Sequence, residues 1–468
     1  MISGSDLDAL RDRVGGPVLT ADDPGFAEDA VGFNAAVVHD PDVIVGATSA
    51  SDVVATVRWA AELGLPVAVQ ATGHGATDRM TDGVLISTRR MQDMEVDLDR
   101  GTARVAAGVK WKSLLPQLVP HGLIALCGSS SDAGIVGYTL GGGLPVLGRA
   151  YGFAADRVRS LEVVTPDGEL RRVDAEHEPD LFEVLRGGKG NFGVVTSLEF
   201  DLVAVRDFYG GGLIYPGADA DVVLTAFRHW VAELPDEACP SVALLRLPDA
   251  PFVPEPLRGR FVVHVRFALA GTKEHGDRLL APMRQVSTPL MDTAGPLSYE
   301  QIDLVNLDPA DPLPFEDGGA LLRDFDDAAQ SALLEVAGPA AQTPLLMIEL
   351  RPLGGALARP SAVKDAVSGR DAAWSLFGIG VLMPPIAELV AAGMERLLDA
   401  MSPWSTGFTL VNFHGHPRDA ADRARAWKPE TYDVITRAKR RYDPKNMMRF
   451  GHAVLVPSGE PVDPAPPL

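Results

Sequence analysis

The sequence predicts an α+β protein with two domains, and three observations support this. Its 468 residues are enough for two or three domains of ordinary size. Residues 1–205 combine short apolar runs, one clear helix and two hairpin signals, with glycine gathered in three loops. Residues 206–410 alternate strand-like and helix-like stretches, and the segment 411–468 adds a helix, a Tyr-Asp-Pro break and a final strand.

The N-terminal part begins with a strand, a helix and a second strand. The apolar run 43–47 is the first strand. Ser51 is the expected N-cap of a helix that places Val53 and Val57 on one face and ends at Gly64. A buried strand follows at 66–72, and it leads directly into a glycine-rich loop around His74.

Two hairpins frame the rest of the first domain. The first surrounds the turn 99–102, and the second surrounds Pro166-Asp167-Gly168. Between them we expect a short amphipathic helix at 112–122 and then the glycine-rich stretch 128–143. A short acidic helix near 178–185 precedes a third glycine-rich loop and a long apolar strand.

The second domain is predicted from longer strands and helices. Strands are expected at 260–271 and 344–357, and helices near 219–233, 272–286 and 386–401. The segment 305–320 is rich in Pro, Asp and Gly, which predicts a surface excursion. The last residues, 459–468, are expected to be frayed.

Composition excludes several classes of protein. The net charge of −21 argues against nucleic acid or a membrane surface as a partner. The two cysteines, Cys127 and Cys239, cannot build a disulfide framework. No apolar signal region opens the chain, and Pro384-Pro385 and Glu388 interrupt its most apolar stretch. We therefore expect a soluble, cytoplasmic enzyme.

The sequence contains partial matches to common nucleotide-binding, hydrolase and metal-binding motifs, but none has the surrounding residues that the function requires. The G-x-G-x-x-G at 188–193 precedes a strand, whereas a dinucleotide site needs a helix there. No P-loop and no G-x-S-x-G elbow occurs. His414 and His416 lack a third metal ligand at recognisable spacing, which favours a surface or supporting role. The loop around His74 is either an anion-binding nest or a simple turn, and the loop alone favours the turn, because short glycine motifs are weak evidence.

The motifs taken together are more specific than any one of them. The G-H-G loop, GSSSDAGIVGYTLGGG, FEVLRGGKGNFGVV, LVNF and YDPKNMMRF follow one another along the chain. In this order and spacing, residues 35–456 resemble the FAD-linked oxidases of the berberine-bridge-enzyme-like group, within the vanillyl-alcohol-oxidase (PCMH-type FAD) superfamily. The resemblance implies an FAD-binding domain at 1–205 and a substrate domain at 206–410, whose antiparallel sheet is covered by helices. It also implies that 411–468 returns to the FAD domain.

The resemblance further implies FAD attached covalently through His74, and no metal. A second link through cysteine is not expected, because Ser130 stands at that position and Cys127 lies three residues too early. The backbone from Ala71 to Thr77 is expected to hold the pyrophosphate. The remaining residues expected at the cofactor are Thr72, Gly73, Gly75, Ala76, Ser129, Gly134, Gly137, Tyr138, Gly141, Gly142, Gly143, Gly193, Val194, Val195, Phe450 and His452.

The substrate side departs from the family pattern. Asn412 is followed by Phe413 where the family often has a catalytic tyrosine, so Tyr138 is the first candidate for the base. Glu349 and Arg351 alternate on one strand and share a face. They either point into the site or form an ion pair on the sheet surface. Lys189 replaces a family glycine and has no assigned role.

The expected function is that of an FAD-linked oxidase acting on a small molecule. It would take hydride from a C–H bond of an alcohol, sugar or secondary metabolite to flavin N5, with O₂ as the electron acceptor. One alternative is a flavin-dependent monooxygenase of secondary metabolism. Another is a non-catalytic flavin-binding protein with the same fold. The sequence does not predict an oligomeric state.

Overall fold

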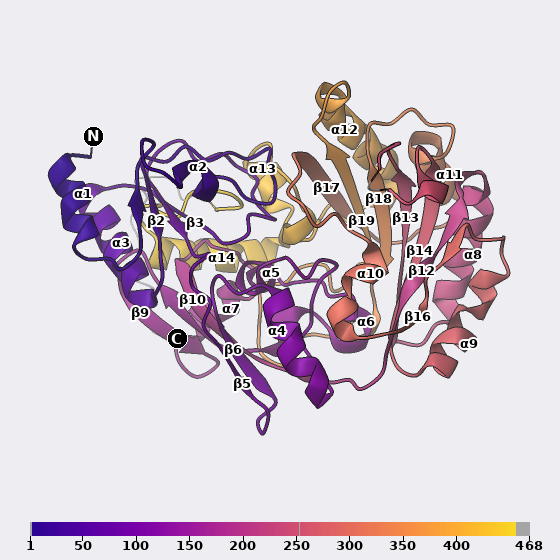
Figure 1. Ribbon diagram of the computed structural model, residues 1–468, viewed down its shortest axis with the longest axis horizontal. Helices are drawn as coiled ribbons and strands as arrows, with labels where there is room; N and C mark the ends of the chain where they lie inside the picture. Colours follow the sequence, from indigo (N-terminus) through magenta and orange to yellow (C-terminus); the bar gives the residue numbers. More distant parts are fainter. Residues whose placement is uncertain (1, 252, 455–468) are drawn as a thin grey trace.

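The protein, described by a computed structural model over residues 2–251 and 253–454, has two lobes with separate sheets. Figure 1 shows the first lobe with the N-terminal half of the chain and the second with the large sheet of β12–β19. This arrangement confirms the predicted α+β fold. The domain limits at 205 and 410 remain predictions.

A small sheet opens the first lobe. Its strands run in the order β1 (Val18–Leu19), β2 (Val43–Gly46), β4 (Val84–Ser87) and β3 (Val67–Gln70), with the last three parallel. The helices beside it are α1 (Gly4–Arg11), α2 (Phe26–Asp29) and α3 (Ala50–Leu63). Helix α3 is capped by Ser49, whose hydroxyl accepts from the Asp52 N–H, so the prediction of Ser51 as N-cap was wrong. The predicted end at Gly64 is confirmed.

A five-stranded antiparallel sheet completes the first lobe. Its order is β5 (Met94–Asp97), β6 (Thr102–Ala106), β10 (Val194–Asp201), β8 (Val158–Val164) and β9 (Leu170–Asp174), which confirms both hairpins. A two-stranded ribbon joins β7 (Leu123–Ile124) to β11 (Val203–Ala204). The helices of this part are α4 (Trp111–Leu118), α5 (Ile135–Leu140), α6 (Gly148–Tyr151) and α7 (Pro179–Leu185).

The C-terminal segment packs on this first lobe. Helices α13 (Ala420–Ala424) and α14 (Pro429–Tyr442) lie beside it in Figure 1, and Trp427 and Ile435 join the apolar core that contains Trp111. The predicted final strand is absent from the described part of 447–454. In its place, the Val67 N–H donates a single bond to the Met447 carbonyl at 3.0 Å. The expectation for 459–468 lies outside the described residues.

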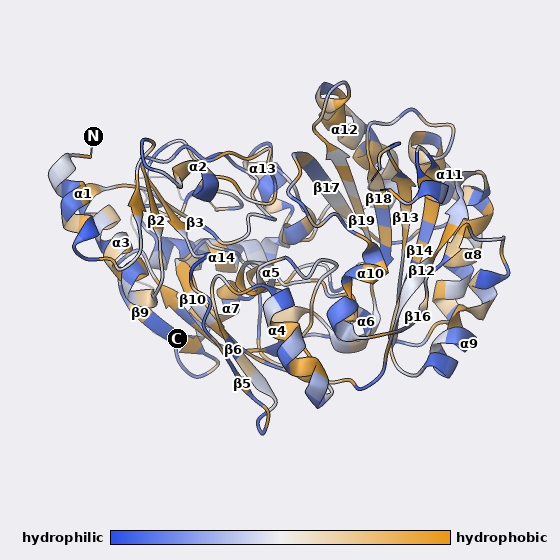
Figure 2. Ribbon diagram, in the orientation of Figure 1, coloured by the Kyte–Doolittle hydropathy of each residue, from blue (hydrophilic) through white to orange (hydrophobic). Residues whose placement is uncertain are grey.

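The second lobe is one large antiparallel sheet. Its strand order is β15 (Met291–Asp292), β12 (Phe208–Pro216), β14 (Phe261–Ala270), β13 (Ala238–Arg246), β18 (Met347–Pro352), β19 (Trp374–Val381) and β17 (Phe315–Leu322), with β16 (Gly295–Leu297) also on β12. Helices α8 (Ala220–Glu233), α9 (Lys273–Arg284), α11 (Asp327–Ala337) and α12 (Val390–Met401) cover one face, and the short α10 (Asp303–Asn306) lies toward the first lobe. Figure 2 shows apolar residues along the strands and mixed polarity on the helices, as a one-sided core requires.

One segment of the second lobe was predicted correctly only in its first part. The run 305–320, rich in Pro, Asp and Gly, was expected on the surface, and residues 307–312 are largely exposed. From Phe315 the prediction was wrong, because β17 begins there and pairs with β19 along its length. Gly318 lies in this strand directly under the Met394 side chain of α12. Gly318 therefore serves helix–sheet packing, and Gly319 lets the Phe413 backbone approach the strand. A turn-forming composition does not reveal either contact.

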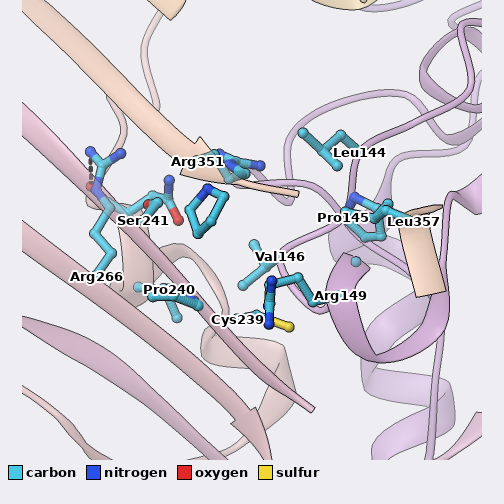
Figure 3. Close-up of a pocket in the computed structure, with 14 residues that line it drawn as sticks. Leu144, Pro145, Val146, Arg149, Cys239, Pro240, Ser241, Arg266, Arg351 and Leu357 are labelled. Carbon is cyan, nitrogen blue, oxygen red and sulfur yellow. Dashed lines mark hydrogen bonds between the residues drawn. The ribbon is translucent and has the colours of Figure 1, made fainter. Parts of the chain in front are cut away.

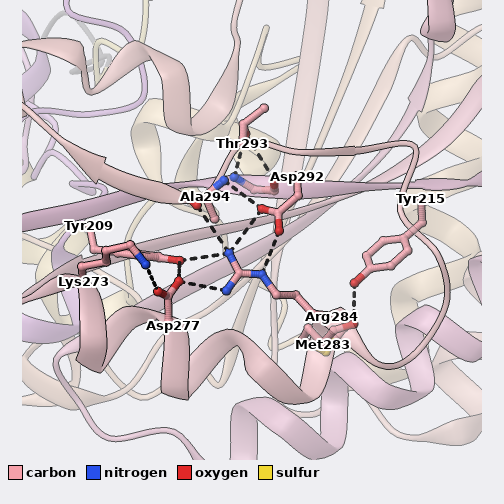
Figure 4. A network of polar contacts seen from close by, with 10 residues as sticks. Tyr209, Tyr215, Lys273, Asp277, Met283, Arg284, Asp292, Thr293 and Ala294 are labelled. Carbon is pink, nitrogen blue, oxygen red and sulfur yellow. Dashed lines mark hydrogen bonds and ion pairs between the residues drawn. The ribbon is translucent and has the colours of Figure 1, made fainter.

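A polar network ties α9 to the edge of the sheet (Figure 4). The guanidinium of Arg284 donates to Asp277 at 3.0 Å and to Asp292 at 2.8 Å. Tyr209 donates to Asp277 at 2.7 Å, and its burial raises the pKa of its phenol to about 12. Among the described helices, none is long and apolar enough to cross a membrane.

Candidate cofactor and active site

The loop after β3 presents His74 beside an aromatic ring. Phe33 stacks on the imidazole with 3.9 Å between ring centroids and 6° between planes. Nδ1 of His74 lies 3.0 Å from the Thr72 hydroxyl, whereas Nε2 is buried and has no hydrogen-bond partner among the described residues. Burial is the main cause that lowers the pKa of His74 to about 4. The ring is therefore neutral at ordinary pH, and its Nε2 atom has no hydrogen-bond partner among the described residues.

Close backbone contact fixes this loop. Gly73 has a φ of +72°, and a Cβ there would lie 2.5 Å from the Cα of Gly32. Only glycine tolerates both conditions without strain. The loop could be found from the sequence, but its contacts with Phe33 and Gly32 could not, because residues 24–41 carry no periodic signal.

The second glycine-rich stretch lies against this loop. Gly134 is the N-cap of α5 and lies against Thr72. A Cβ atom added to Gly134 would lie 3.5 Å from Cγ2 of that threonine. A Cβ on Gly141, at the end of α5, would overlap Oδ1 of Asn412. Asn412 in turn donates from Nδ2 to the Tyr138 carbonyl at 2.9 Å. These contacts bring together the His74 loop, the glycine-rich stretch 128–143 and the segment that contains Asn412.

Tyr138 points its hydroxyl into the protein. Its ring makes an edge-to-face contact with Trp111 at 5.6 Å, and its hydroxyl is buried without a partner in the described structure. Burial raises the pKa of this phenol well above its usual value. Such surroundings disfavour the phenolate that a general base requires, so they do not support the expected role of Tyr138 as proton acceptor.

The third glycine-rich loop contributes Lys189. Its φ is +60°, and its N–H donates to the Leu140 carbonyl at 3.0 Å. Its Nζ lies 3.6 Å from the Cβ position of Gly75, so its side chain runs between two of the expected cofactor loops. Burial lowers the pKa of Lys189 to about 8. Gly193 is in the same loop, and Val194 and Val195 begin β10.

Glu349 and Arg351 form an ion pair at the junction of the lobes, with Glu349 buried and Arg351 half-buried, so the pair does not lie on an exposed face of the sheet. Both lie on β18, with side-chain exposures of 5% and 12%. Glu349 accepts from Arg266 at 2.8 Å, from Arg351 at 2.9 Å and from Ser241 at 2.8 Å. These cations hold the pKa of Glu349 low despite its burial, so its carboxylate stays ionised.

A cavity lies beside this ion network (Figure 3). Ser241, Arg266 and Arg351 line it from the large sheet, and Val146 and Arg149 line it from the first lobe. Next to it, Arg351 lies 6.0 Å from the ring of Phe413, which packs on Phe377 at 5.0 Å. The wall of the cavity is therefore cationic, and two aromatic rings lie beyond Arg351.

Asp317 is a titratable group that the sequence analysis missed. It lies on β17, with its carboxylate 3.2 Å from the Cβ position of Gly415. Burial raises the pKa of Asp317 to about 7, and Lys189 counteracts part of that rise. An acid of this pKa exchanges protons near neutral pH. Its segment had been predicted as a surface loop, which hid it.

The C-terminal segment completes the site with two histidines. His452 Nε2 lies 3.2 Å from His414 Nδ1, and both rings are buried. His416 contacts Asp78 at 2.8 Å instead. Phe450 packs on the apolar cluster that contains Met80. Within 2–251 and 253–454, no group of three or more His, Cys, Asp or Glu residues is suited to a metal ion.

The arrangement fits the expected cofactor. The unpartnered Nε2 of His74 supplies a nucleophilic nitrogen, and Gly73, Gly75 and Gly134 place backbone without side chains around it. Cys127 is buried in the core, 3.9 Å from the carbonyl of Ser130, and burial raises the pKa of its thiol. A protonated buried thiol is a poor nucleophile. These facts support one attachment point rather than two.

Comparison with known proteins gives a consistent result. The family model described as FAD binding domain matches residues 41–174. The chain is 28% identical over 458 residues to (R)-6-hydroxynicotine oxidase of Paenarthrobacter nicotinovorans, covering 94% of this chain and 96% of that protein. It superposes on the crystal structure of 6-hydroxy-D-nicotine oxidase from Arthrobacter nicotinovorans with a TM-score of 0.80 and 26% identity, covering 97% and 98%. It shares its fold with wild-type BBE-like 1 of Physcomitrella patens, at a TM-score of 0.82, 17% identity and coverage of 97% and 99%.

Proposed function

Because this chain is an FAD-linked oxidoreductase with the PCMH-type fold of the berberine-bridge-enzyme-like oxidases, we propose that it is an oxidase with FAD attached covalently through His74. The observation that supports this most directly is the state of that imidazole. It is neutral and buried, and Nε2 has no partner in the described structure. A neutral imidazole nitrogen is a competent nucleophile toward an electrophilic carbon.

The cofactor, when bound, supplies the two-electron acceptor for a substrate C–H bond, and O₂ is the proposed final acceptor. Gly73, Gly75 and Gly134 would hold it through the backbone. Gly141, Gly142, Gly143 and Asn412 would approach it from the second segment. This mode of binding needs no lysine at the pyrophosphate, which agrees with the acidic composition of the chain.

The residues facing the substrate have different roles. Arg351 and the rings of Phe377 and Phe413 would orient a small molecule with an apolar part. Asp317 is the proposed proton acceptor, since its pKa of about 7 matches that role better than the buried phenol of Tyr138. Glu349 would keep Arg351 in place through its ion pair. The substrate is an alcohol, sugar or secondary metabolite.

Acid precipitation tests the attachment. The purified holoenzyme is denatured in acid, and flavin absorbance is measured in pellet and supernatant. Yellow pellets are expected for the wild type and for His121→Ala, a control that changes an exposed histidine far from the loop. Colourless pellets are expected for His74→Ala. Wild-type pellets without flavin would refute covalent attachment.

A substrate panel tests the oxidase activity. Anaerobic reduction of the flavin by alcohols, sugars and phenols, followed by peroxide release in air, is the expected behaviour. Oxygen incorporated from O₂ into the product would instead indicate a monooxygenase. A flavin that no substrate reduces would favour a non-catalytic binding protein.

A further inference from the structure

Three neighbouring strands of the large sheet place polar residues in one row beside the first lobe. Arg266 of β14 pairs with Ser241 of β13 in the antiparallel register. Val242 of β13 pairs with Leu350 of β18, so Ser241 stands opposite Arg351. Residues directly opposite each other point to the same side of a sheet. All three residues of the row line the cavity at the junction of the lobes (Figure 3).

Positive charge exceeds negative charge around this cavity. Among the described residues that line it, three are arginines and none is Asp or Glu. Glu349 pairs with Arg266 at 2.8 Å and with Arg351 at 2.9 Å. Asp308 lies 3.8 Å from Arg266. Arg149, the third arginine, bonds to backbone carbonyls and makes no ion pair in the described structure. Three guanidinium groups therefore have two carboxylate partners, which leaves one positive charge in excess.

Two of the three arginines also keep N–H groups without a partner. Arg351 donates from Nη2 to Glu349, and neither its Nε nor its Nη1 has a hydrogen-bond partner among the described residues. Arg149 donates from Nε and Nη1 to two backbone carbonyls, at 2.9 and 2.6 Å, and its Nη2 has no partner among them. Arg266, by contrast, donates from all three nitrogens within the protein. The unused donors therefore belong to one arginine of each lobe.

The size of the cavity limits what can bind there. Its volume is about 20 Å³, which is room for one or two groups the size of a water molecule. It would hold a small head group rather than a whole substrate. The side chain of Arg351 is 12% exposed, and a guanidinium charge at such low exposure is costly unless an anion pairs with it. A carboxylate supplies one negative charge and matches the planar edge of a guanidinium.

We infer that this cavity binds a carboxylate group of the substrate, with Arg351 as the residue that recognises it and Arg149 on the opposite wall. The inference rests on the oxidase function proposed above. It adds the chemical class of the substrate, which is an alcohol that carries a carboxylate.

The surroundings of Arg351 show where the rest of such a substrate would lie. The ring centroid of Phe413 is 6.0 Å from the guanidinium carbon of Arg351. Asn412, the preceding residue, donates to the Tyr138 carbonyl and contacts the Gly141 position, where the cofactor is expected. A substrate whose carboxylate is held at Arg351 can therefore extend along the Phe413 ring toward the cofactor. The charge would fix one end of the molecule, and the ring would contact its apolar part.

Ligand binding tests the inference without turnover. The purified, oxidised holoenzyme is titrated with acetate, benzoate and phenylacetate, and separately with the carboxamide of each, by isothermal titration calorimetry. The two members of a pair have nearly the same shape and differ in charge. Hydrogen bonds to a charged group should make at least one carboxylate bind about 10- to 100-fold more tightly than its carboxamide. If no carboxylate binds more tightly than its carboxamide, the inference is overturned.

Variants of Arg351 assign this preference to one residue. Arg351→Gln removes the charge, and Arg351→Lys keeps a cation beside Glu349 but removes the planar fork. Arg396→Gln, at an exposed arginine of α12, is the matched control. We expect the preference for the carboxylate to fall below about threefold in Arg351→Gln, to fall severalfold in Arg351→Lys, and to stay unchanged in Arg396→Gln.

A folding control keeps the comparison decisive. Circular dichroism and the flavin-to-protein ratio show whether each variant is folded and loaded. If Arg351→Gln does not fold, Arg351→Lys carries the test, because it preserves the ion pair with Glu349. An unchanged preference for the carboxylate in a folded variant of Arg351 would overturn the assignment of the site to this residue.

Matched pairs of alcohols connect the site to the reaction. Anaerobic reduction of the flavin is measured with 4-(hydroxymethyl)benzoate and mandelate, and with the carboxamide of each. The carboxylates should reduce the flavin with a kcat/KM at least about 10-fold higher, and Arg351→Gln should abolish that advantage. Equal reduction by both members of each pair overturns this inference and leaves the oxidase function standing. Tight carboxylate binding without reduction by any alcohol refutes the oxidase function, and the substrate class fails with it.

Discussion

Removing Asp443 should destabilise the protein severely, because the buried ammonium of Lys439 would lose its counter-ion. Lys439 and Asp443 form an ion pair at 2.6 Å, and both side chains are 0% exposed. The Lys439 ammonium also donates to the Asn191 and Met448 carbonyls, at 3.0 and 2.5 Å. Burial lowers the pKa of Lys439, and the Asp443 carboxylate counteracts part of that fall.

The expected cost follows from these contacts. In Asp443→Ala, an ammonium without a counter-ion is left in the core, which costs about 3–5 kcal/mol. The N–H groups of Met447 and Met448 also lose their carboxylate acceptor, now 2.7 and 2.8 Å away. Each such loss adds about 1 kcal/mol. A total of about 5–7 kcal/mol is a large part of the roughly 5–15 kcal/mol that stabilises an ordinary domain.

Urea unfolding of the holoenzyme measures this cost, followed by circular dichroism and by flavin fluorescence. The pair Lys439→Met and Asp443→Leu, made together, removes both charges and should recover at least half of the loss. Lys445→Ala, at an exposed neighbour, should change the free energy of unfolding by less than about 0.5 kcal/mol. If Asp443→Ala and Lys445→Ala unfold at the same urea concentration, the reasoning about the buried pair is wrong.

Three further outcomes are expected. Gly141→Ala should lower the flavin-to-protein ratio at least severalfold, because its Cβ would displace the Asn412 amide; an unchanged ratio would contradict that contact. The pKa of Asp317 is about 7 in the folded protein and 3.8 in the ordinary, unfolded state. Between these values the folded state holds a proton that the unfolded state has lost. The contribution of Asp317 to the free energy of unfolding is therefore present below pH 4 and is lost as the pH rises to about 7. The advantage of the wild type over Asp317→Asn in unfolding experiments should therefore shrink between pH 4 and 7, whereas a constant difference would contradict the raised pKa. EDTA treatment should leave flavin reduction unchanged, and loss of activity with recovery by a divalent cation would refute the expectation of a metal-free enzyme.

Local patterns in the sequence predicted the elements whose signal is local. The hairpins at 99–102 and 166–168 were predicted because turn residues and alternation lie within a few positions of each other. The N-cap of α3 was misplaced by two residues, since Ser49 and Ser51 are equivalent until the geometry of the cap is known. Strand β17 was missed because Gly318 makes room for Met394 and Gly319 for Phe413, and both partners are distant in the chain.

The same distinction applies to the site. The glycine-rich segments and His74 could be found from residue types and their order, because a cofactor held by backbone needs glycine at fixed places. The sequence could not show which nitrogen of His74 lacks a hydrogen-bond partner, because that depends on the contacts that Phe33 and Thr72 make with the imidazole. The sequence could not predict the low exposure of the Glu349 and Arg351 side chains either, nor the raised pKa of Asp317.

The sequence by itself determined the fold class, the FAD-binding character and the loops involved, because these depend on spacing and composition along the chain. Only the tertiary structure decided which groups can react. Tyr138 became a buried phenol against Trp111, and Asp317 became an acid that titrates near neutral pH. The physical reason is that a pKa and a free lone pair depend on burial and on neighbours in space, and those neighbours come from distant parts of the chain.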